Sequence, residues 1–397
     1  MQTKIAANAH AMKRWLGKAE TTLGNHSDRL NAINIFPVAD GDTGTNLYLT
    51  VRAAAAAFLD GSGRDEPTND VGAVLASAGR AAMEQARGNS GTLFAVFLCA
   101  AAEPLVGHTR LSAPLLASAL NRAQIRAWSA LSEPVPGTML SVLEAAAKAA
   151  DECDTAHHGD DSNQALGLAL DAAVHAALDA VVRTEDQLAP LHAAHVVDAG
   201  GVGMLLVLDC LRSAVLGEEL QDELLDGLHG YDLQDPHIHA GMPDDDGVEV
   251  MCTISLSPLA AATLRQRLDE LGDSVIMSQV GSASHEGSAS HVRSASHVRS
   301  ASHEGSASHV RSASHEGSAG RPGGPAGREG SSDSDDDDDD DDAVETSYRW
   351  RVHVHVPDAE PAVALIRSLG DPTDISVSQL SMPRDPGLPA GQHGHES

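Results

Sequence analysis

Two kinds of hydrophobic spacing divide this chain. Up to about residue 216, apolar residues recur every three or four positions, which is the spacing of a helix with one buried face. The pattern is clear over 70–86 (DVGAVLASAGRAAMEQA), where Asp70 is placed to cap the first turn, and again over 166–181. Further helices are expected at 4–22, 45–59, 91–103, 111–131, 138–151 and 201–216. Gly, Pro and Asp fill the breaks, so the pattern predicts about eight helices in a bundle or helical barrel.

Beyond about residue 246 the spacing changes to strict alternation. The stretches 248–256 (VEVMCTISL) and 348–356 (YRWRVHVHV) place every second residue on one apolar face, as in a half-buried strand. Shorter strands are expected at 274–280 and 375–381, and helices at 258–271 and 359–369. The order βαββαβ is typical of a ferredoxin-like sandwich. The sequence therefore predicts a helical domain (1–216), a linker (217–245) and a smaller α/β domain (246–381).

A low-complexity insert interrupts the expected α/β domain at 282–347. It holds six copies of a hexapeptide, Ser-Ala-Ser-His followed by Glu-Gly or Val-Arg, and then a run of aspartates. Large apolar side chains are almost absent, so the insert cannot offset the entropy cost of ordering and is expected to be disordered. The tail at 382–397 is expected to be disordered too. Its six regularly spaced histidines could bind metal loosely, but a solvated low-complexity loop is the favoured interpretation.

Composition narrows the possible partners. The 397 residues are 42% hydrophobic but only 3% aromatic, so Ala, Leu and Val must build a core of closely packed helices. The formal net charge is −31, which argues against nucleic acid and anionic membranes as partners. On such an acidic protein, a polyanion such as ATP requires a local site that contains metal ions.

The cysteines and the N-terminal sequence indicate which compartment the protein occupies. The four cysteines are scattered without a tight spacing, which argues against a disulfide scaffold. The first twenty residues lack the apolar core of a secretory signal. No apolar run reaches the ~18 residues that a membrane span needs. The chain is therefore expected to be soluble and cytoplasmic, without a membrane span.

The candidate chemistry begins with two aspartates, Asp40 and Asp42, separated by one glycine in the stretch NIFPVADGDTGTN. One interpretation is a turn followed by a helix cap, because Asp and Gly are ordinary turn residues. The other is a magnesium site, because Mg²⁺ is typically held by one or two carboxylates together with substrate phosphates. Asn46 would then open a helix whose N-terminus favours anions.

Three other stretches place small residues just before an expected helix. They are ARGNSGT with Gly88, Asn89, Ser90 and Gly91, PVPGTML with Thr138 and Met139, and VVDAGGVG with Asp198 and Gly200. Exposed backbone N–H groups at such helix starts can bind phosphates. Four such helix starts in one domain, one of them with paired carboxylates, favour a polyphosphate site over isolated turns.

These four motifs, in this order and spacing, resemble the nucleotide-binding domain of the DhaL type. Within that group they are most similar to the ATP-binding subunit of bacterial fatty-acid kinase. The resemblance covers about residues 1–216 and extends more loosely over 246–381. It implies an antiparallel helical barrel that holds ATP and two Mg²⁺ ions at one end. The resembled kinase continues into a further domain that engages a carrier protein, whereas this chain stops near residue 397.

The resemblance also implies roles for individual residues. Asp40 and Asp42 would bind the metal ions and serve catalysis, and Asn34 stands near where dihydroxyacetone kinases carry a third metal-binding aspartate. Contacts to phosphates or to the metal shell would come from Thr43, Gly44, Asn46, Gly88, Asn89, Ser90 and Gly91. Thr138 and Met139 would lie near the base, and Asp198 and Gly200 would help to close the nucleotide site.

A zinc site is a second candidate. His353 and His355 form an H-x-H pair on an expected strand, and Cys252 lies on a strand that a ferredoxin-like sheet places next to it. The resembled kinase has matching residues and binds zinc there. Alternation places Cys252 on the apolar face and the histidines on the opposite one, so a bulge or register offset would be required. The alternative is a core cysteine with exposed histidines.

Three functions remain open from the sequence. The first is a kinase subunit that transfers the γ-phosphoryl group of ATP to a fatty acid presented by a carrier protein. The second is a dihydroxyacetone-kinase-like subunit, which lacks support because no covalent ketone-binding histidine is evident. The third is a non-catalytic scaffold that binds Mg-nucleotide. A homodimer is left open in each case.

Overall fold

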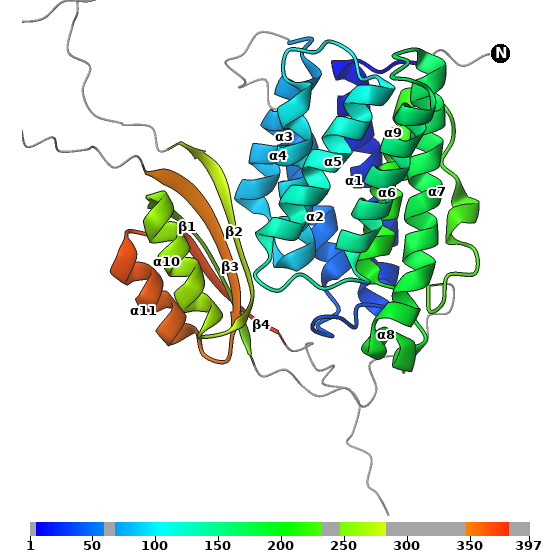
Figure 1. The fold of residues 1–397 in the computed structure, drawn as a ribbon. Helices are drawn as coiled ribbons and strands as arrows, with labels where there is room; N and C mark the ends of the chain where they lie inside the picture. The colour runs from blue at the N-terminus through cyan, green and yellow to red at the C-terminus, as the bar shows by residue number, and fades with distance from the viewer. Residues whose placement is uncertain (1–4, 59–67, 232–246, 283–346, 381–397) are drawn as a thin grey trace, which may run out of the picture. The chain divides into compact units, whose positions relative to one another are not determined.

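The structure, a computed structural model, describes residues 5–58, 68–231, 247–282 and 347–380 (Figure 1). These residues belong to one compact unit, and a second unit, Ser284–Glu345, lies outside them. The hexapeptide repeats, the aspartate run and the tail at 382–397 therefore fall outside the described residues, so their predicted disorder stays a prediction. So does the exact division of the chain into domains.

The N-terminal region is helical, as the 3.6-residue spacing predicts. Its α-helices are α1 Ala9–Ala32, α2 Thr43–Ala56, α3 Val71–Gln85, α4 Gly88–Ala102, α5 Ala113–Ala130, α6 Met139–Ala156, α7 Asn163–Gln187, α8 Ala189–Ala194 and α9 Ala199–Leu216, and its short 3₁₀ segments are η1 Glu103–Leu105 and η2 Asp222–Leu225. From α1 to α7 each helix contacts the next, and α9 contacts both α7 and α1, which closes the ring. The prediction of a helical barrel is confirmed.

The apolar pattern misses the last part of α1 and the whole of α8. Asn8 caps α1 by accepting a hydrogen bond from the amide of Ala11, and the helix continues ten residues past the predicted end. Leu23 and Leu30, seven positions apart, stay on the buried face while polar residues between them face outward. The polar stretch 24–29 hid this continuation. The short helix α8 was not predicted at all.

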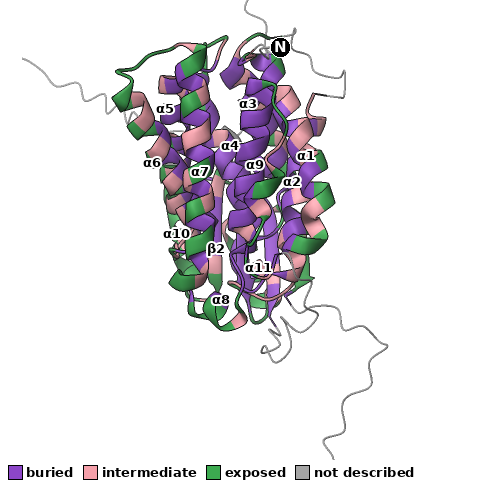
Figure 2. Ribbon diagram, turned by 90° about the vertical axis from the view of Figure 1, so that its right-hand side faces the viewer, coloured by how far each residue is buried: buried purple, intermediate pink, exposed green. Residues whose placement is uncertain are grey.

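Helix α9 forms the centre of the core, and every residue in it except Gly200 is buried (Figure 2). Gly203 allows this close packing, because a Cβ there would lie 2.4 Å from Cδ1 of Leu47 on α2. By length and hydropathy α7 and α9 could also cross a membrane, which the sequence reading did not anticipate. The complete burial of α9 within the barrel is what a core helix of this composition requires.

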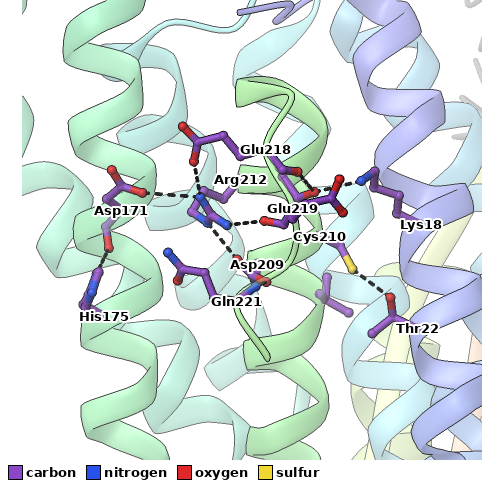
Figure 3. Close-up of polar contacts among 12 residues, drawn as sticks. Lys18, Thr22, Asp171, His175, Asp209, Cys210, Arg212, Glu218, Glu219 and Gln221 are labelled. Atoms are coloured by element: carbon purple, nitrogen blue, oxygen red, sulfur yellow. Dashed lines mark hydrogen bonds and ion pairs between the residues drawn. The ribbon is translucent and has the colours of Figure 1, made fainter. Parts of the chain in front are cut away.

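One charge in this core is fully compensated. Arg212 of α9 is buried, and its guanidinium donates to Oδ1 of Asp209 and to Oε2 of Glu218, both at 2.7 Å (Figure 3). It also donates to the carbonyl of Glu219 at 2.8 Å, while Oδ2 of Asp209 accepts from the amide of Gln221. A buried charge requires such partners. The network fastens the segment after α9 to the barrel.

The C-terminal region is a four-stranded antiparallel sheet with two helices. Its elements are β1 Val248–Leu256, α10 Pro258–Asp269, β2 Asp273–Ser282, β3 Tyr348–Val356, α11 Ala359–Leu369 and β4 Thr373–Gln379, with strand order β2-β3-β1-β4. This confirms the predicted βαββαβ order and its ferredoxin-like arrangement. Helices α10 and α11 cover one face of the sheet (Figure 1).

The two faces of the sheet differ in chemistry because β1 and β3 alternate. Cys252 pairs with Val352, and both lie in the apolar layer under α10 and α11. The opposite face, called the polar face here, carries Glu249, Met251 and Thr253 on β1 and Arg349, Arg351, His353 and His355 on β3. Strand β2 meets the end of α5, where Ser132 donates to the carbonyl of Val275 at 3.1 Å.

We expect Arg212→Met to lower the free energy of unfolding by about 3–5 kcal/mol, because Asp209 would stay buried without its cation. The matched control is Arg110→Met, which removes an exposed pair with Asp161 and should cost less than about 1 kcal/mol. Urea unfolding followed by circular dichroism measures both variants. Equal losses would show that burial of Arg212 adds nothing to the interaction.

Candidate functional site

The loop between α1 and α2 brings Asp40 and Asp42 together. Both side chains line the same small cavity, and Gly41 between them has a φ of +69°, a conformation that favours glycine. The buried side chain of Asn34 donates from Nδ2 to the carbonyl of Val38 at 2.6 Å and to Oδ1 of Asp40 at 3.0 Å. Asn34 therefore holds the loop and one carboxylate in place.

The two carboxylates cannot both carry a charge at low energetic cost. Burial, and next the charge of Asp42, raise the pKa of Asp40 to about 8. Burial also raises the pKa of Asp42, although a hydrogen bond from Asn46 works against it. In the absence of a cation the pair keeps a proton near neutral pH. A divalent cation between the carboxylates would displace this proton, because the ion favours their charged forms.

The start of α4 lies against α2 at the same place. Gly88 has a φ of +58°, and a Cβ there would lie 2.4 Å from Nδ2 of Asn46, so only glycine fits without displacement. Ser90, which is buried, donates to the carbonyl of Thr43 at 3.3 Å. Oδ1 of Asn89 is buried and has no hydrogen-bond partner within the described part of the chain. Polar groups of this kind are expected where a ligand binds.

The starts of α6 and α9 form the other side of the site. Thr138 caps α6, and its hydroxyl donates to the carbonyl of Val135 at 2.9 Å. Asp198 caps α9, where its Oδ2 accepts from the amide of Gly201 at 2.6 Å. Burial raises the pKa of Asp198 to about 7, while hydrogen bonds from the amides of Gly201 and Met139 oppose the shift. The carboxyl of Asp198 therefore joins the two helix starts.

Two adjoining cavities connect these elements. A small one of about 50 Å³ contains the paired carboxylates, and a larger one of about 340 Å³ has the apolar walls of Phe36, Leu93 and Val135. Both are lined by Phe36, Pro37, Val38, Thr43, Asn89 and Ser90. Thr138, Met139, Asp198 and Gly200 line the larger cavity, and Asn34 and Gly88 line the smaller one. The predicted residues thus converge from four separate stretches.

Three of the predicted residues do not line either cavity. A Cβ on Gly44 would lie 2.2 Å from the carbonyl oxygen of Ser27, so this glycine serves the packing of α2 against α1. Gly91 has the same role between α4 and α2, because a Cβ there would lie 2.4 Å from Oγ1 of Thr50. Asn46 is buried and reaches the site only through its hydrogen bond to Asp42.

The polar face of the sheet contributes Glu249, which sequence reasoning missed. Oε1 of Glu249 accepts from the amide of Gly88 at 3.0 Å, and Oε2 accepts from Oγ of Ser378 at 2.9 Å. Its charge also raises the pKa of Asp40 and Asp42. The only signal in the sequence was the position of Glu249, the second residue of the strand, on the side opposite its apolar face. No sequence pattern pointed to Glu133 or Asp273, which line the larger cavity.

Glu249, His353 and His355 form a cluster on this face that could hold a metal ion. Their ligand atoms lie within 4.8 Å of one another, and Nε2 of His353 is 3.3 Å from Oε1 of Glu249 without the alignment of a hydrogen bond. Burial lowers the pKa of His353 to about 3, so its imidazole is neutral and able to bind a metal. One carboxylate and two imidazoles suit Zn²⁺.

The structure does not bring Cys252 to these histidines. Cys252 is buried in the apolar layer under α10 and α11, while His353 pairs with Met251 on the opposite face. The bulge in β1 lies between Met251 and Thr253, and it affects the pairing with β4 but leaves the register with β3 continuous. The register offset that a Cys252–His353–His355 site requires is therefore missing, and Glu249 stands in the third position.

With this geometry in view, comparison with known families identifies the kind of domain. Residues 37–213 match the DAK2 domain family. This similarity is to the DhaL-like type of domain that the four motifs lead us to expect. This match spans the paired carboxylates and the starts of α4, α6 and α9.

Related proteins occur in staphylococci. The chain is 28% identical over 268 residues to an uncharacterized protein of Staphylococcus epidermidis and 27% identical over 267 residues to one of Staphylococcus aureus. Each comparison covers 64% of this chain and 46% of the relative, so the match spans about half of the relative's length.

Among solved structures, the chain is similar to the dihydroxyacetone kinase of C. freundii. One structure of that kinase is a complex with AMP-PNP and Mg²⁺ (22% identity, TM-score 0.38), and another is its native form (23% identity, TM-score 0.38). Each covers 53% of this chain and 35% of the kinase chain.

Stability without metal should depend on pH through Asp40. A carboxyl whose pKa is raised on folding stabilises the protein at low pH, and this contribution is lost as the pH rises towards 8. In EDTA we expect Asp40→Asn to melt at least about 2 °C above the wild type at pH 8.5, with a smaller difference at pH 5. Mg²⁺ should raise the Tm of the wild type but not that of the variant.

The matched control for this comparison is Asp28→Asn, which makes the same change on an exposed part of α1. Differential scanning calorimetry of all three proteins gives the result. If Asp40→Asn melts below the wild type at both pH values, the carboxylates do not repel each other in the folded protein.

Proposed function

We propose that this chain is the ATP-binding, magnesium-dependent subunit of a kinase. It would transfer the γ-phosphoryl group of ATP to the carboxylate of a fatty acid that a separate carrier protein presents. The observation that carries the proposal is the pair of adjoining cavities, one acidic and small, the other larger and partly apolar. A metal-bound triphosphate suits the acidic lining of the small cavity, and a base suits the partly apolar lining of the larger one.

Magnesium suits the residues of the small cavity. Mg²⁺ prefers oxygen ligands and is commonly held by one or two carboxylates plus substrate phosphates. Asp40 and Asp42 would hold the ion, and Asn34 would orient Asp40. When bound, magnesium would neutralise charge on the transferring phosphoryl group. Thr43, Asn89 and Ser90 lie where both cavities meet, in a position to orient the phosphates.

The larger cavity would orient the base and ribose. Thr138 and Asp198 supply a polar end to a cavity whose apolar walls include Met139, Phe36 and Leu93. No protein nucleophile is required, because phosphoryl transfer can proceed by positioning and charge neutralisation. The acceptor would approach from the acidic end of the site.

The assignment of the acceptor rests on the motifs that resemble the ATP-binding subunit of fatty-acid kinase. The chain spans about half the length of its staphylococcal relatives, so the carrier protein and the activity of the whole protein are proposals. Cytoplasmic localisation and a homodimer are proposed on the same basis. A dihydroxyacetone-kinase-like activity and a non-catalytic scaffold are the outcomes that the tests below separate from a fatty-acid kinase.

Nucleotide binding should require both magnesium and the paired carboxylates. In isothermal titration with AMP-PNP, we expect Asp40→Asn and Asp42→Asn to weaken Mg²⁺-dependent binding by at least about 100-fold. Asp28→Asn serves as the control of equal charge and should bind as the wild type does. Binding that is unaffected by EDTA would overturn the magnesium site.

The acceptor can be identified by the chemistry of the product. A fatty-acid-loaded carrier with ATP would yield an acyl phosphate, which hydroxylamine converts to a hydroxamate. Dihydroxyacetone would yield a stable phosphate ester that hydroxylamine leaves intact. We expect hydroxamate formation with wild-type protein and at least about a 100-fold loss in Asp42→Asn. ATP binding without turnover on any acceptor would instead indicate a scaffold.

We also propose a zinc ion on the polar face of the sheet. Three ligands were expected, Cys252, His353 and His355, and the geometry favours Glu249 in place of Cys252. Glu249→Gln and His353→Asn should each weaken zinc binding by at least about 10-fold, whereas Cys252→Ser should leave it unchanged. Competition with a chromogenic chelator measures the affinity. Loss of zinc binding in Cys252→Ser would instead support Cys252, His353 and His355 as the ligands.

A further inference from the structure

A second buried arginine of this protein differs sharply from Arg212. Arg351 lies on the polar face of β3 and is only 6% exposed. Its guanidinium makes two long hydrogen bonds, one to Oγ1 of Thr253 at 3.3 Å and one to the carbonyl of Ala86 at 3.4 Å. Nε of Arg351 has no partner among the described residues.

No carboxylate neutralises this guanidinium. Within the described ranges Arg351 forms no ion pair, whereas Arg212 has carboxylates at 2.7 Å (Figure 3). A buried cation without an anion is strongly unfavourable in a protein interior. An anion that binds from outside the chain would remove this cost.

The space for such an anion is present. A cavity of about 550 Å³ lies beside Arg351, between the polar face and the turn from α3 to α4. Arg87 and Arg349 also line it, and neither forms an ion pair in the described part of the chain. Three guanidinium groups that form no ion pair with any described residue thus border one cavity. Their planar N–H groups match the oxygens of carboxylates and phosphates.

Three acidic residues line the same cavity without neutralising Arg351. Glu249 is engaged with the amide of Gly88 and the hydroxyl of Ser378. Glu84 and Asp374 are exposed, and neither lies within ion-pair distance of Arg351. Asp374 lines the cavity together with Arg351, so its carboxylate would compete with an incoming anion.

We propose that Arg351, with Arg349 and Arg87, forms a binding site for a small oxyanion, a carboxylate or a phosphate. Glu249 lines both this cavity and the one that contains Asp40 and Asp42, so the bound anion would lie next to the magnesium site. Resting on the proposed function, we assign the anion as the carboxylate of the acceptor. Arg351 would then position the group that attacks the γ-phosphorus.

The experiment uses the full chain in EDTA without nucleotide, so that a failed kinase assay cannot affect it. Octanoate, inorganic phosphate and the neutral analogue octanol are compared by thermal shift and isothermal titration. At saturating octanoate we expect the wild-type Tm to rise by about 2 °C or more. Arg351→Met should weaken octanoate binding by at least about 10-fold, and Arg351→Lys by less.

Two controls separate binding from a structural role. Arg367→Gln removes an exposed charge on α11, on the opposite face of the sheet, and should bind octanoate as the wild type does. Asp374→Asn should tighten octanoate binding, because it removes a competing anion. Without ligand, Arg351→Met should melt no lower than the wild type, since it removes an unpaired charge.

Several results would overturn the proposal. Octanol acting as well as octanoate would point to apolar binding, and unchanged binding in Arg351→Met would place the anion elsewhere. A lower Tm for both Arg351→Met and Asp374→Asn would show that the two residues pair with each other. Phosphate binding without octanoate binding would overturn the assignment to an acceptor carboxylate. Asp42→Asn should lose magnesium-nucleotide binding and keep octanoate binding.

Discussion

The repulsion between Asp40 and Asp42 is the constraint on which the site depends. The fold forces the two carboxylates together through Gly41, the buried amide of Asn34 and the start of α2. Without a cation the pair must keep a proton near neutral pH, because burial raises the pKa of Asp40 to about 8. The protein thus maintains a locally unfavourable arrangement of two carboxyl groups, and strongly shifted pKa values of this kind cluster at functional sites.

The packing that maintains this arrangement comes from close helix contacts. Gly88 and Gly91 let α4 approach α2, and Gly203 lets α9 approach α2 from the core. Alanine-rich helices allow the buried helix α9 to close the ring between α7 and α1 with few aromatic side chains. The buried Arg212 network then fixes the chain as it leaves the barrel. Near the site, Asn89 and His353 have buried polar atoms without hydrogen-bond partners among the described residues.

The polar face of the sheet adds charged side chains and imidazoles to those of the helical region. Glu249 contacts the amide that begins α4, and His353 and Arg351 lie on the neighbouring strand. A carboxylate at a helix N-terminus occupies the kind of position that a phosphate favours. The sheet therefore supplies charged groups next to the place where phosphoryl transfer is proposed. Arg212 in the barrel has carboxylate partners, whereas Arg351 on the sheet forms no ion pair with any described residue.

The sequence by itself determined the kinds of elements and the four stretches that meet at the site, because hydrophobic period and turn chemistry are local properties. It placed Cys252 and the histidines on opposite faces by alternation, and the continuous register of β1 with β3 kept them there. Only the tertiary structure decided that α1 continues to Ala32, that Gly44 and Gly91 serve packing, that Glu249 reaches the site and that Arg351 lines a neighbouring cavity. Those outcomes depend on contacts between residues distant in the chain, and no local pattern encodes such contacts.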